Sequence, residues 1–305
     1  MTIMKKVLFG ILMAVSASFA TAQTAVMQQD MFADMGPDDK AVVVAVHYGS
    51  TDADVRKDAI EKFNARLRNE FPNCDFRQAW TSRQIVRELG AQGEVIFTPV
   101  QLLNELSVLG YTHVLIQSSD MTDGVEMQHL RSEVQAAKRK FKHIRVGEPL
   151  LHSVKDYEMM ILATAAAYGK EKEANVLVCY ASKGALDTSY TMLDYMLRDR
   201  CMDNWYVTTI GGYPDLNNLK NELKQRKDKK INLIPCVFLA GEHVRADVVE
   251  KMKDDLKDSK FKVSVTMHCL GESNEILDRY MEHARFARQY RTLTPTEIKL
   301  VESAY

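Results

Sequence analysis

Imidazole and phenol side chains stand at the ends of several apolar runs in this sequence. Three runs end in this way: residues 41–46 before His47, residues 175–179 before Tyr180, and residues 231–239 before His243. A neutral imidazole binds borderline divalent metals and takes up protons near neutral pH, and a tyrosine can bind a metal as a phenolate. The three residues are therefore candidates for metal and proton chemistry. For His47, a packed and hydrogen-bonded strand end is an equal alternative.

A second group of potential ligands lies in residues 120–129, which hold three carboxylates, two methionines and His129. One interpretation is an axial haem contact or a metal entry point. The other is a loop and helix start, in which acidic groups complement the helix dipole and Met127 enters the core. We favour the helix start.

The elements that would position these residues alternate along the chain. Residues 41–46 form an unbroken run of valine and alanine, which is typical of a strand covered on both faces. Apolar residues at helical spacing follow in residues 55–67, and the same alternation recurs up to a last helix over residues 273–290. This order predicts an α/β fold with parallel sheets flanked by helices. Ligands of such sheets bind beyond the carboxyl ends of the strands.

Two parts of the chain begin alike, since Tyr48-Gly49-Ser50 follows the first run and Tyr180-Ala181-Ser182 follows the run at residues 175–179. The echo indicates an internal duplication. We therefore expect an N-terminal lobe over residues 40–150 and a C-terminal lobe, including the final helix, over residues 151–305.

The N-terminus has the three-part pattern of a signal peptide. Two lysines precede an apolar run at residues 7–17 and a small-residue stretch at residues 18–22, so we expect cleavage after Ala22 and export to the periplasm. The apolar run is short for a membrane span, and the mature protein is not expected to cross a membrane. Residues 23–39 are polar and rich in methionine, which favours a flexible linker.

Composition excludes some classes of function. The 40 basic and 41 acidic residues give a formal net charge of -1, which argues against a nucleic-acid partner because phosphate binding draws on a basic excess. The five cysteines form no CxxC pair, so neither a zinc ribbon nor a disulfide scaffold is predicted.

Nine short segments, read in order, resemble the anaerobic sirohydrochlorin cobaltochelatases, which are class II, ferrochelatase-like chelatases. The segments are Val46-His47-Tyr48-Gly49-Ser50, Ala79-Trp80-Thr81-Ser82, Thr98-Pro99, Gly110-Tyr111, Ile116-Gln117-Ser118, Pro149-Leu150-Leu151, Gly212-Tyr213-Pro214, Ala240-Gly241-Glu242-His243 and Leu270-Gly271-Glu272. The resemblance implies two similar lobes with a tetrapyrrole in the cleft between them. It also implies Co²⁺ as the metal, with Fe²⁺ or Ni²⁺ as alternatives and haem as a further candidate ligand.

The same resemblance implies a metal site made by a His, a Glu and a His on three turns of the second lobe. The last of these matches His243, whereas Tyr180 follows Cys179 where the first histidine is expected, and Gly211-Gly212 stands where the glutamate is expected. Metal sites normally use three or four protein ligands. We therefore predict His243 and His47 as metal ligands and add Tyr180 to them as a catalytic residue.

Further residues are assigned to the cleft on the same grounds. The residues expected to contact the tetrapyrrole are Tyr48, Ser50, Gly211, Tyr213 and Glu242. Alternative ligands that would refill the metal site are Glu242, Asp215 and Cys179.

Two functions remain open at this point. The favoured one is an enzyme that inserts Co²⁺ or Fe²⁺ into sirohydrochlorin or a related macrocycle of a cobalamin-type pathway, because other side chains can replace ligands in a preserved cleft. The alternative is a non-catalytic periplasmic protein that binds haem, a corrinoid or a metal, which the export signal and the replaced ligands favour. Removal of metal from a tetrapyrrole would use the same cleft. A homo-oligomer is compatible with each function.

Overall fold

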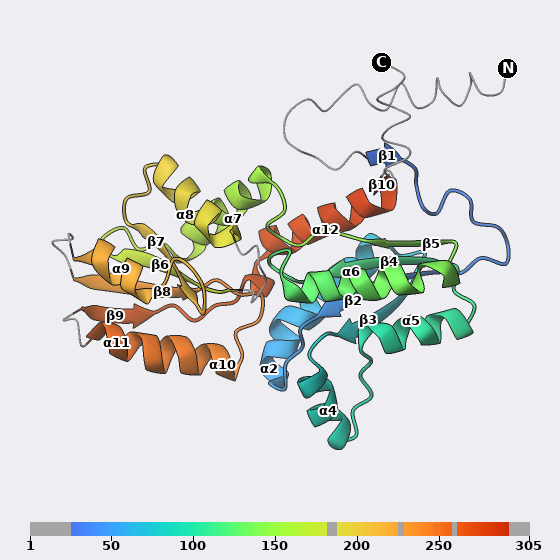
Figure 1. The fold of residues 1–305 in the computed structure, drawn as a ribbon, viewed down its shortest axis with the longest axis horizontal. Helices are drawn as coiled ribbons and strands as arrows, with labels where there is room; N and C mark the ends of the chain where they lie inside the picture. Colours follow the sequence, from blue (N-terminus) through green and yellow to red (C-terminus); the bar gives the residue numbers. More distant parts are fainter. Residues whose placement is uncertain (1–25, 182–187, 225–228, 258–260, 293–305) are drawn as a thin grey trace, which may run out of the picture.

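Two four-stranded parallel sheets form the centre of the fold (Figure 1). The computed structural model describes residues 26–181, 188–224, 229–257 and 261–292. The first sheet has the order β3-β2-β4-β5 and the second the order β7-β6-β8-β9. Counted from its own first strand, each sheet has the same strand order, in agreement with the duplication. The predicted α/β fold with two similar lobes is confirmed.

The strands have the following bounds. They are β2 (Ala41–His47), β3 (Asp75–Trp80), β4 (His113–Ser118) and β5 (His143–Val146) in the first sheet, and β6 (Ala174–Tyr180), β7 (Trp205–Ile210), β8 (Lys230–Pro235) and β9 (Lys262–Val265) in the second. The central strand β2 is buried on both faces: Val43 and Ala45 join one hydrophobic cluster, and Val42, Val44 and Val46 join another. Alternate residues of a strand point to opposite faces, so an uninterrupted apolar run is the pattern that two covered faces require.

Helices connect the strands and cover both sheets. Those between β2 and β5 are α2 (Ala53–Val55), the π-helical η1 (Arg56–Ile60), α3 (Glu61–Glu70), α4 (Arg83–Ala91), α5 (Pro99–Val108), α6 (Val125–Ala137) and the 3₁₀ turn η2 (Lys138–Lys140). After β5 come α7 (Val154–Tyr168), α8 (Ser189–Asp199), α9 (Leu216–Leu223), α10 (Glu242–Val244), the π-helical η3 (Arg245–Met252), α11 (Lys253–Lys257), the 3₁₀ turn η4 (Leu270–Glu272) and α12 (Asn274–Gln289). Within the described ranges, no helix combines the length and the apolar character that crossing a bilayer requires.

The segment at residues 120–129 is a loop followed by a helix start. Helix α6 begins at Val125 with Glu126 in its first turn, and Met127 is fully buried. His129 lies on the exposed side of the helix. These positions agree with the helix-start interpretation.

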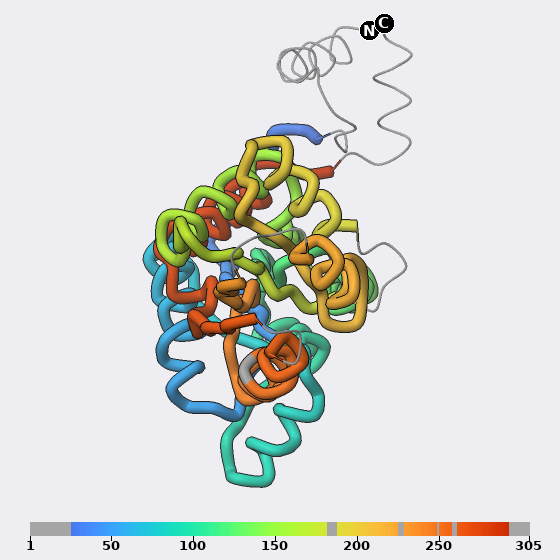
Figure 2. The backbone as a smooth tube through the Cα atoms, turned by 90° about the vertical axis from the view of Figure 1, so that its left-hand side faces the viewer, coloured from blue at the N-terminus to red at the C-terminus, as the bar shows by residue number. Residues whose placement is uncertain are grey.

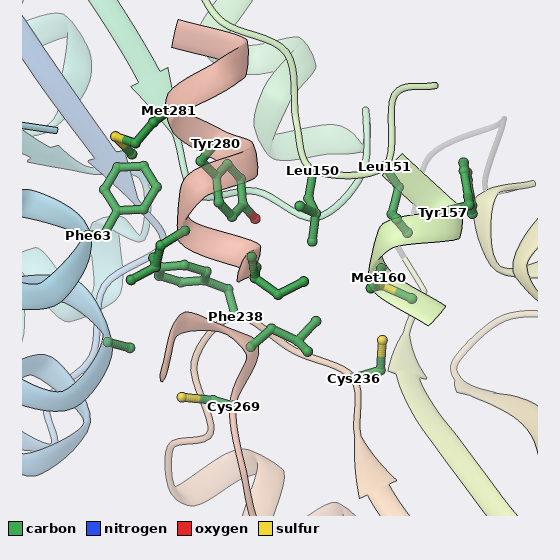
Figure 3. Packing of buried hydrophobic residues seen from close by; sticks show 14 of the residues in the cluster. Phe63, Leu150, Leu151, Tyr157, Met160, Cys236, Phe238, Cys269, Tyr280 and Met281 are labelled. Atoms are coloured by element: carbon green, nitrogen blue, oxygen red, sulfur yellow. The ribbon is translucent and has the colours of Figure 1, made fainter. Parts of the chain in front are cut away.

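The last helix, α12, packs on the first lobe as well as on α7 of the second. It contacts α3, β4 and β5, and Tyr280 is fully buried there and donates to the carbonyl oxygens of Ser119 and Asp120 at 2.9 and 3.1 Å. Figure 3 shows the Tyr280 ring close to Phe63 and to Phe238, which comes from the second lobe. The final helix was predicted as part of the C-terminal lobe. The structure corrects this, because the apolar face of the helix completes a core that both lobes share.

The N-terminal segment is packed from residue 26 onward, so its prediction as a flexible linker is wrong there. Strand β1 (Val26–Gln28) pairs antiparallel with β10 (Tyr290–Thr292), and the two lie together in Figure 2. Met31 is fully buried, and Asp30 receives two hydrogen bonds from Arg288 at 3.1 and 2.8 Å. The predicted signal peptide and residues 23–25 lie outside the described residues.

Candidate functional site between the two lobes

Turns from the two lobes meet beyond the carboxyl ends of the strands. Gly241, which precedes α10 in the second lobe, is so close to the first lobe that a Cβ atom built on it would lie 3.6 Å from the Ser50 Oγ. Tyr48, on the same turn as Ser50, is 50% exposed. Gly49 between them has a φ of 98° and packs on the ring of Trp80, so a side chain at this position would be strained and would clash.

The turns after β6 and β7 are also in contact with each other. A Cβ on Gly212 would lie 2.3 Å from the Cβ of Ala181, so only glycine fits there. Gly211 has a φ of 82°, and Tyr213 is 64% exposed. Five of the predicted cleft residues therefore lie on strand-end turns of both lobes. These residues are Tyr48, Ser50, Gly211, Tyr213 and Glu242.

Tyr180 lies beside both His243 and Asp247. The Tyr180 hydroxyl is 3.0 Å from the Asp247 Oδ2 and 3.4 Å from the His243 carbonyl oxygen. Burial, together with the hydrogen bond to Asp247, raises the pKa of Tyr180 well above its usual value. The side chain is therefore a phenol donating to a carboxylate, which argues against the predicted phenolate ligand. The His243 side chain is exposed, and Glu242 beside it is exposed as well.

The sequence analysis missed Asp247. It lies four residues after His243 on the continuous helical stretch formed by α10 and η3. Residues at this spacing share one face of a helix, so the His-x-x-x-Asp pattern was the signal that could have revealed a carboxylate next to the histidine.

His47 is not brought into this site. The ring is 1% exposed, its Nδ1 lies 2.9 Å from the Ser119 Oγ, and its Nε2 lies 3.0 Å from the Asn64 Oδ1. Both nitrogens are thus occupied by hydrogen bonds, and the ring stacks on Phe238 at 6.0 Å. The structure corrects the prediction of His47 as a catalytic residue and metal ligand, because the second lobe covers the end of β2 and leaves no lone pair free.

Two alternative ligands are also placed elsewhere. The Asp215 carboxylate caps the N-terminus of α9 by accepting from the backbone N–H groups of Asn217 and Asn218, both at 2.9 Å. Cys179 is fully buried in the shared core. Around His243, the described histidine, cysteine and carboxylate side chains form no group of three with ligand atoms within 4.8 Å of one another.

The buried state of His47 makes stability depend on pH in a defined way. Burial lowers its pKa from 6.5 to about 4, so the folded state favours the neutral ring. This contribution is fully present above the unfolded-state pKa and is lost as the pH falls from there through the folded-state pKa. We expect this loss to lower the free energy of unfolding by about 2 kcal/mol between pH 7 and pH 5. Urea unfolding at the two pH values measures the effect.

The comparison variant for this measurement is His47→Asn, which removes the titrating group. Asp120 titrates in the same range with the opposite sign, because burial raises its pKa to about 6 and stabilises the protonated form at lower pH. The difference in pH dependence between the wild type and His47→Asn therefore isolates His47. An identical pH dependence in both proteins would contradict the assignment.

A small cavity lies beside the strand-end turns, between the lobes. Its volume is about 130 Å³, and it is lined by residues of both lobes, among them Asp52, Asp54, Arg245, His268 and Glu272. Ligand pockets for molecules of drug size hold about 300–1,000 Å³. This cavity is therefore too small for a macrocycle.

Comparison with known proteins gives a consistent result. A family model described as "Cobalt chelatase (CbiK)" matches residues 40–288. The chain is 28% identical over 230 residues to the sirohydrochlorin cobaltochelatase CbiKC of Nitratidesulfovibrio vulgaris (Hildenborough), covering 72% of this chain and 81% of that protein. It is 27% identical over 221 residues to the sirohydrochlorin cobaltochelatase of Salmonella typhimurium LT2, covering 72% and 83%.

Solved structures share the fold. The structure of SirB from Bacillus subtilis with Fe³⁺ matches with a TM-score of 0.59 and 12% identity, covering 82% of this chain and 96% of that one. The sirohydrochlorin chelatase SirB from Bacillus subtilis subspecies spizizenii in complex with cobalt matches with a TM-score of 0.54 and 13% identity, covering 82% and 95%. At these identities the likeness establishes the two-lobed architecture.

Proposed function

Because the chain belongs to the cobalt chelatase family, we propose that it is an enzyme that inserts a divalent metal, with Co²⁺ as the principal substrate ion, into a tetrapyrrole of the sirohydrochlorin class. Family membership over residues 40–288 is the observation that carries the proposal, and it confirms the resemblance seen in the nine sequence segments. Fe²⁺ and Ni²⁺ remain alternative substrate ions.

The chemistry of insertion defines what the site residues have to do. Two pyrrole protons must leave the macrocycle, and the ion must exchange water for ring nitrogens. His243 presents an exposed imidazole at the sheet edge, whose one lone pair can bind a borderline ion or, after the ion has passed to the ring, accept a proton. The Asp247 carboxylate, held by the Tyr180 hydroxyl, is positioned to take a proton onward from that edge.

A sparse set of protein ligands is compatible with insertion. An ion held by a closed set of three or four protein ligands has few positions left for incoming nitrogens. With His243 as the imidazole and Gly211 in place of a carboxylate side chain, most coordination positions stay open to water and then to the macrocycle. We therefore propose that the protein binds the ion transiently, while the exposed side chains of Tyr48 and Tyr213 contact the macrocycle.

An anaerobic insertion assay tests the proposal. The purified protein is mixed with sirohydrochlorin and Co²⁺, and absorbance follows the metallated ring. We expect the rate to exceed that of the same mixture without protein and to increase in proportion to protein concentration. A rate equal to the uncatalysed one for Co²⁺, Fe²⁺ and Ni²⁺ alike would contradict the enzyme.

A second candidate function rests on one specific observation. Tyr180 and Gly211 occupy positions where the family resemblance implies a histidine and a glutamate. A protein that had lost insertion chemistry would still hold haem or a corrinoid at the same turns. Tight binding of either ligand, measured by absorbance titration without any insertion, is the result that would select this carrier.

We also propose that the chain is exported, on the strength of its N-terminal charge and apolar pattern in residues 1–22. The expected result is a mature protein that begins at Gln23 and is released with the periplasmic fraction. Intact mass spectrometry of the protein isolated from its own cells measures this directly. A mass that still includes residues 1–22 would contradict cleavage.

A further inference from the structure

Two histidines face each other at the end of the first sheet that lies opposite to the strand-end turns. His113 is the first residue of β4 and His143 the first residue of β5, and they are partners in the parallel register. In-register partners on adjacent strands project from the same face, about 4.8 Å apart. The two rings accordingly have their centroids 5.1 Å apart.

A carboxylate closes this pair. Asp34 comes from the segment between β1 and β2, and its Oδ2 lies 2.9 Å from the His143 Nε2, while its Oδ1 lies 3.3 Å from the His113 Nε2. Taking one ligand atom from each residue, all three atoms lie within 4.8 Å of one another. The segment itself is anchored, because Met31 is buried and Asp30 is paired with Arg288.

These separations are close to those of metal ligands. A tetrahedral zinc ion binds imidazole nitrogen and carboxylate oxygen at about 2.0–2.2 Å, so neighbouring ligand atoms stand roughly 3.3 Å apart. The two distances from Asp34 fall near that value, and a modest approach of the rings would complete the triangle. The Asp34 side chain is 59% exposed, which leaves a coordination position open to water.

The hydrogen bond on the other side of His113 provides independent support. Its Nδ1 lies 2.8 Å from the Thr112 Oγ1, and that hydroxyl donates to the Lys40 carbonyl oxygen at 3.3 Å. With an ion bound to Nε2, Nδ1 would carry the imidazole proton and donate it to this hydroxyl. A hydrogen bond from the ring nitrogen that does not bind the metal orients metal-binding histidines in this way. The His113 ring is 0% exposed, so its surroundings fix the direction in which Nε2 points.

We propose that Asp34, His113 and His143 form a second divalent-metal site, suited to a borderline ion such as Zn²⁺, Co²⁺ or Ni²⁺ and separate from the insertion site. Two imidazoles and one carboxylate are a ligand set that these ions accept. The ion would connect the N-terminal segment to the open ends of β4 and β5. Without the ion, the hydrogen bonds between Asp34 and the two rings make the same connection more weakly.

The test measures Zn²⁺ binding to the full-length protein by isothermal titration calorimetry. We expect His143→Ala and Asp34→Asn each to weaken the tight Zn²⁺ equivalent by about 100-fold or more, since even outer partners of metal ligands contribute 10–100-fold. His243→Ala is expected to retain this equivalent, and so is the control His129→Ala, which removes an exposed histidine from the same lobe. In thermal unfolding, Zn²⁺ should raise the Tm of the wild type, and the rise in His243→Ala should be only slightly smaller. The Tm of Asp34→Asn should not change when Zn²⁺ is added.

Two results would overturn the proposal. One is unchanged Zn²⁺ affinity and stoichiometry in both Asp34→Asn and His143→Ala. The other is loss of the tight equivalent in His243→Ala while His143→Ala keeps it, which would place the only tight ion at the insertion site. The Asp34→Asn variant separates the loss of a metal ligand from unfolding of the protein. The Asp34 side chain is exposed, and asparagine has nearly the same shape. The Tm of this variant without metal should lie close to that of the wild type.

Discussion

Replacing His243 with alanine is expected to lower the rate of Co²⁺ insertion at least about 100-fold, because changes to outer partners of metal ligands alone cost 10–100-fold. The exposed imidazole is the proposed metal-binding group at the sheet edge, and the substitution leaves the phenol of Tyr180 and the carboxylate of Asp247 in place. The measurement is the anaerobic assay with sirohydrochlorin, followed by absorbance at saturating and at limiting Co²⁺.

The matched control is His129→Ala, which removes another exposed histidine outside the strand-end turns. It should insert Co²⁺ at the wild-type rate. The free energy of unfolding should change by less than about 0.5 kcal/mol in both variants, since the two side chains are exposed. Wild-type rates in His243→Ala at both Co²⁺ concentrations would remove His243 from the mechanism.

Replacing Asp156 with alanine is expected to lower the free energy of unfolding by about 3–5 kcal/mol, the range for breaking a buried charge pair. The carboxylate is fully buried in α7, receives the backbone N–H of Ser153 at 2.5 Å, and binds Arg279 and His283 of α12. Removing it leaves the Arg279 charge largely buried without this partner and removes the Asp156 half of the capping box of α7. Urea unfolding at pH 7 measures the loss.

Glu158→Ala on the same helix is the control. Glu158 pairs with Arg200 at the surface, where an ion pair contributes only about 0–1 kcal/mol. A loss in Asp156→Ala as small as that in Glu158→Ala would show that the buried network does not stabilise the fold.

The same network has a pH signature. Burial alone would raise the pKa of Asp156, but hydrogen bonds and charge interactions with His283, together with bonds from Ser153 and Arg279, lower it overall. A carboxylate with a lowered folded-state pKa contributes stability above its unfolded-state value and loses it as the pH falls through the folded-state pKa. The difference between wild type and Asp156→Ala should therefore persist at neutral pH and shrink below about pH 4.

Much of the fold could be predicted because strands and helices are encoded locally. The valine-rich run before His47 predicted the central strand, and the last helix was predicted within one residue of its observed ends, Asn274 and Gln289. The partner of that helix could not be predicted in the same way. An amphipathic pattern shows that one face is buried, but it carries no information on which lobe covers it.

The candidate site shows the same limit. His243 and Tyr180 were predicted at strand ends, and the structure places both at one edge of the second sheet. His47 also ends a strand, yet Phe238 from the other lobe covers it, and no pattern near His47 in the sequence signals that contact. The histidines at 113 and 143 had no motif support, because their pairing depends on the register of two strands thirty residues apart.

The position of α12 has a consequence for how the chain matures. The face of the first sheet that carries Val43 and Ala45 shares its cluster with Tyr280 and Ala284, residues made more than two hundred positions later. Contacts between such distant parts of a chain slow folding, because a long loop must close before they form. During synthesis, this face of the first sheet is therefore covered only in part, by α3, until α12 has emerged. A chain interrupted before residue 274 would keep that surface open and would be prone to aggregate.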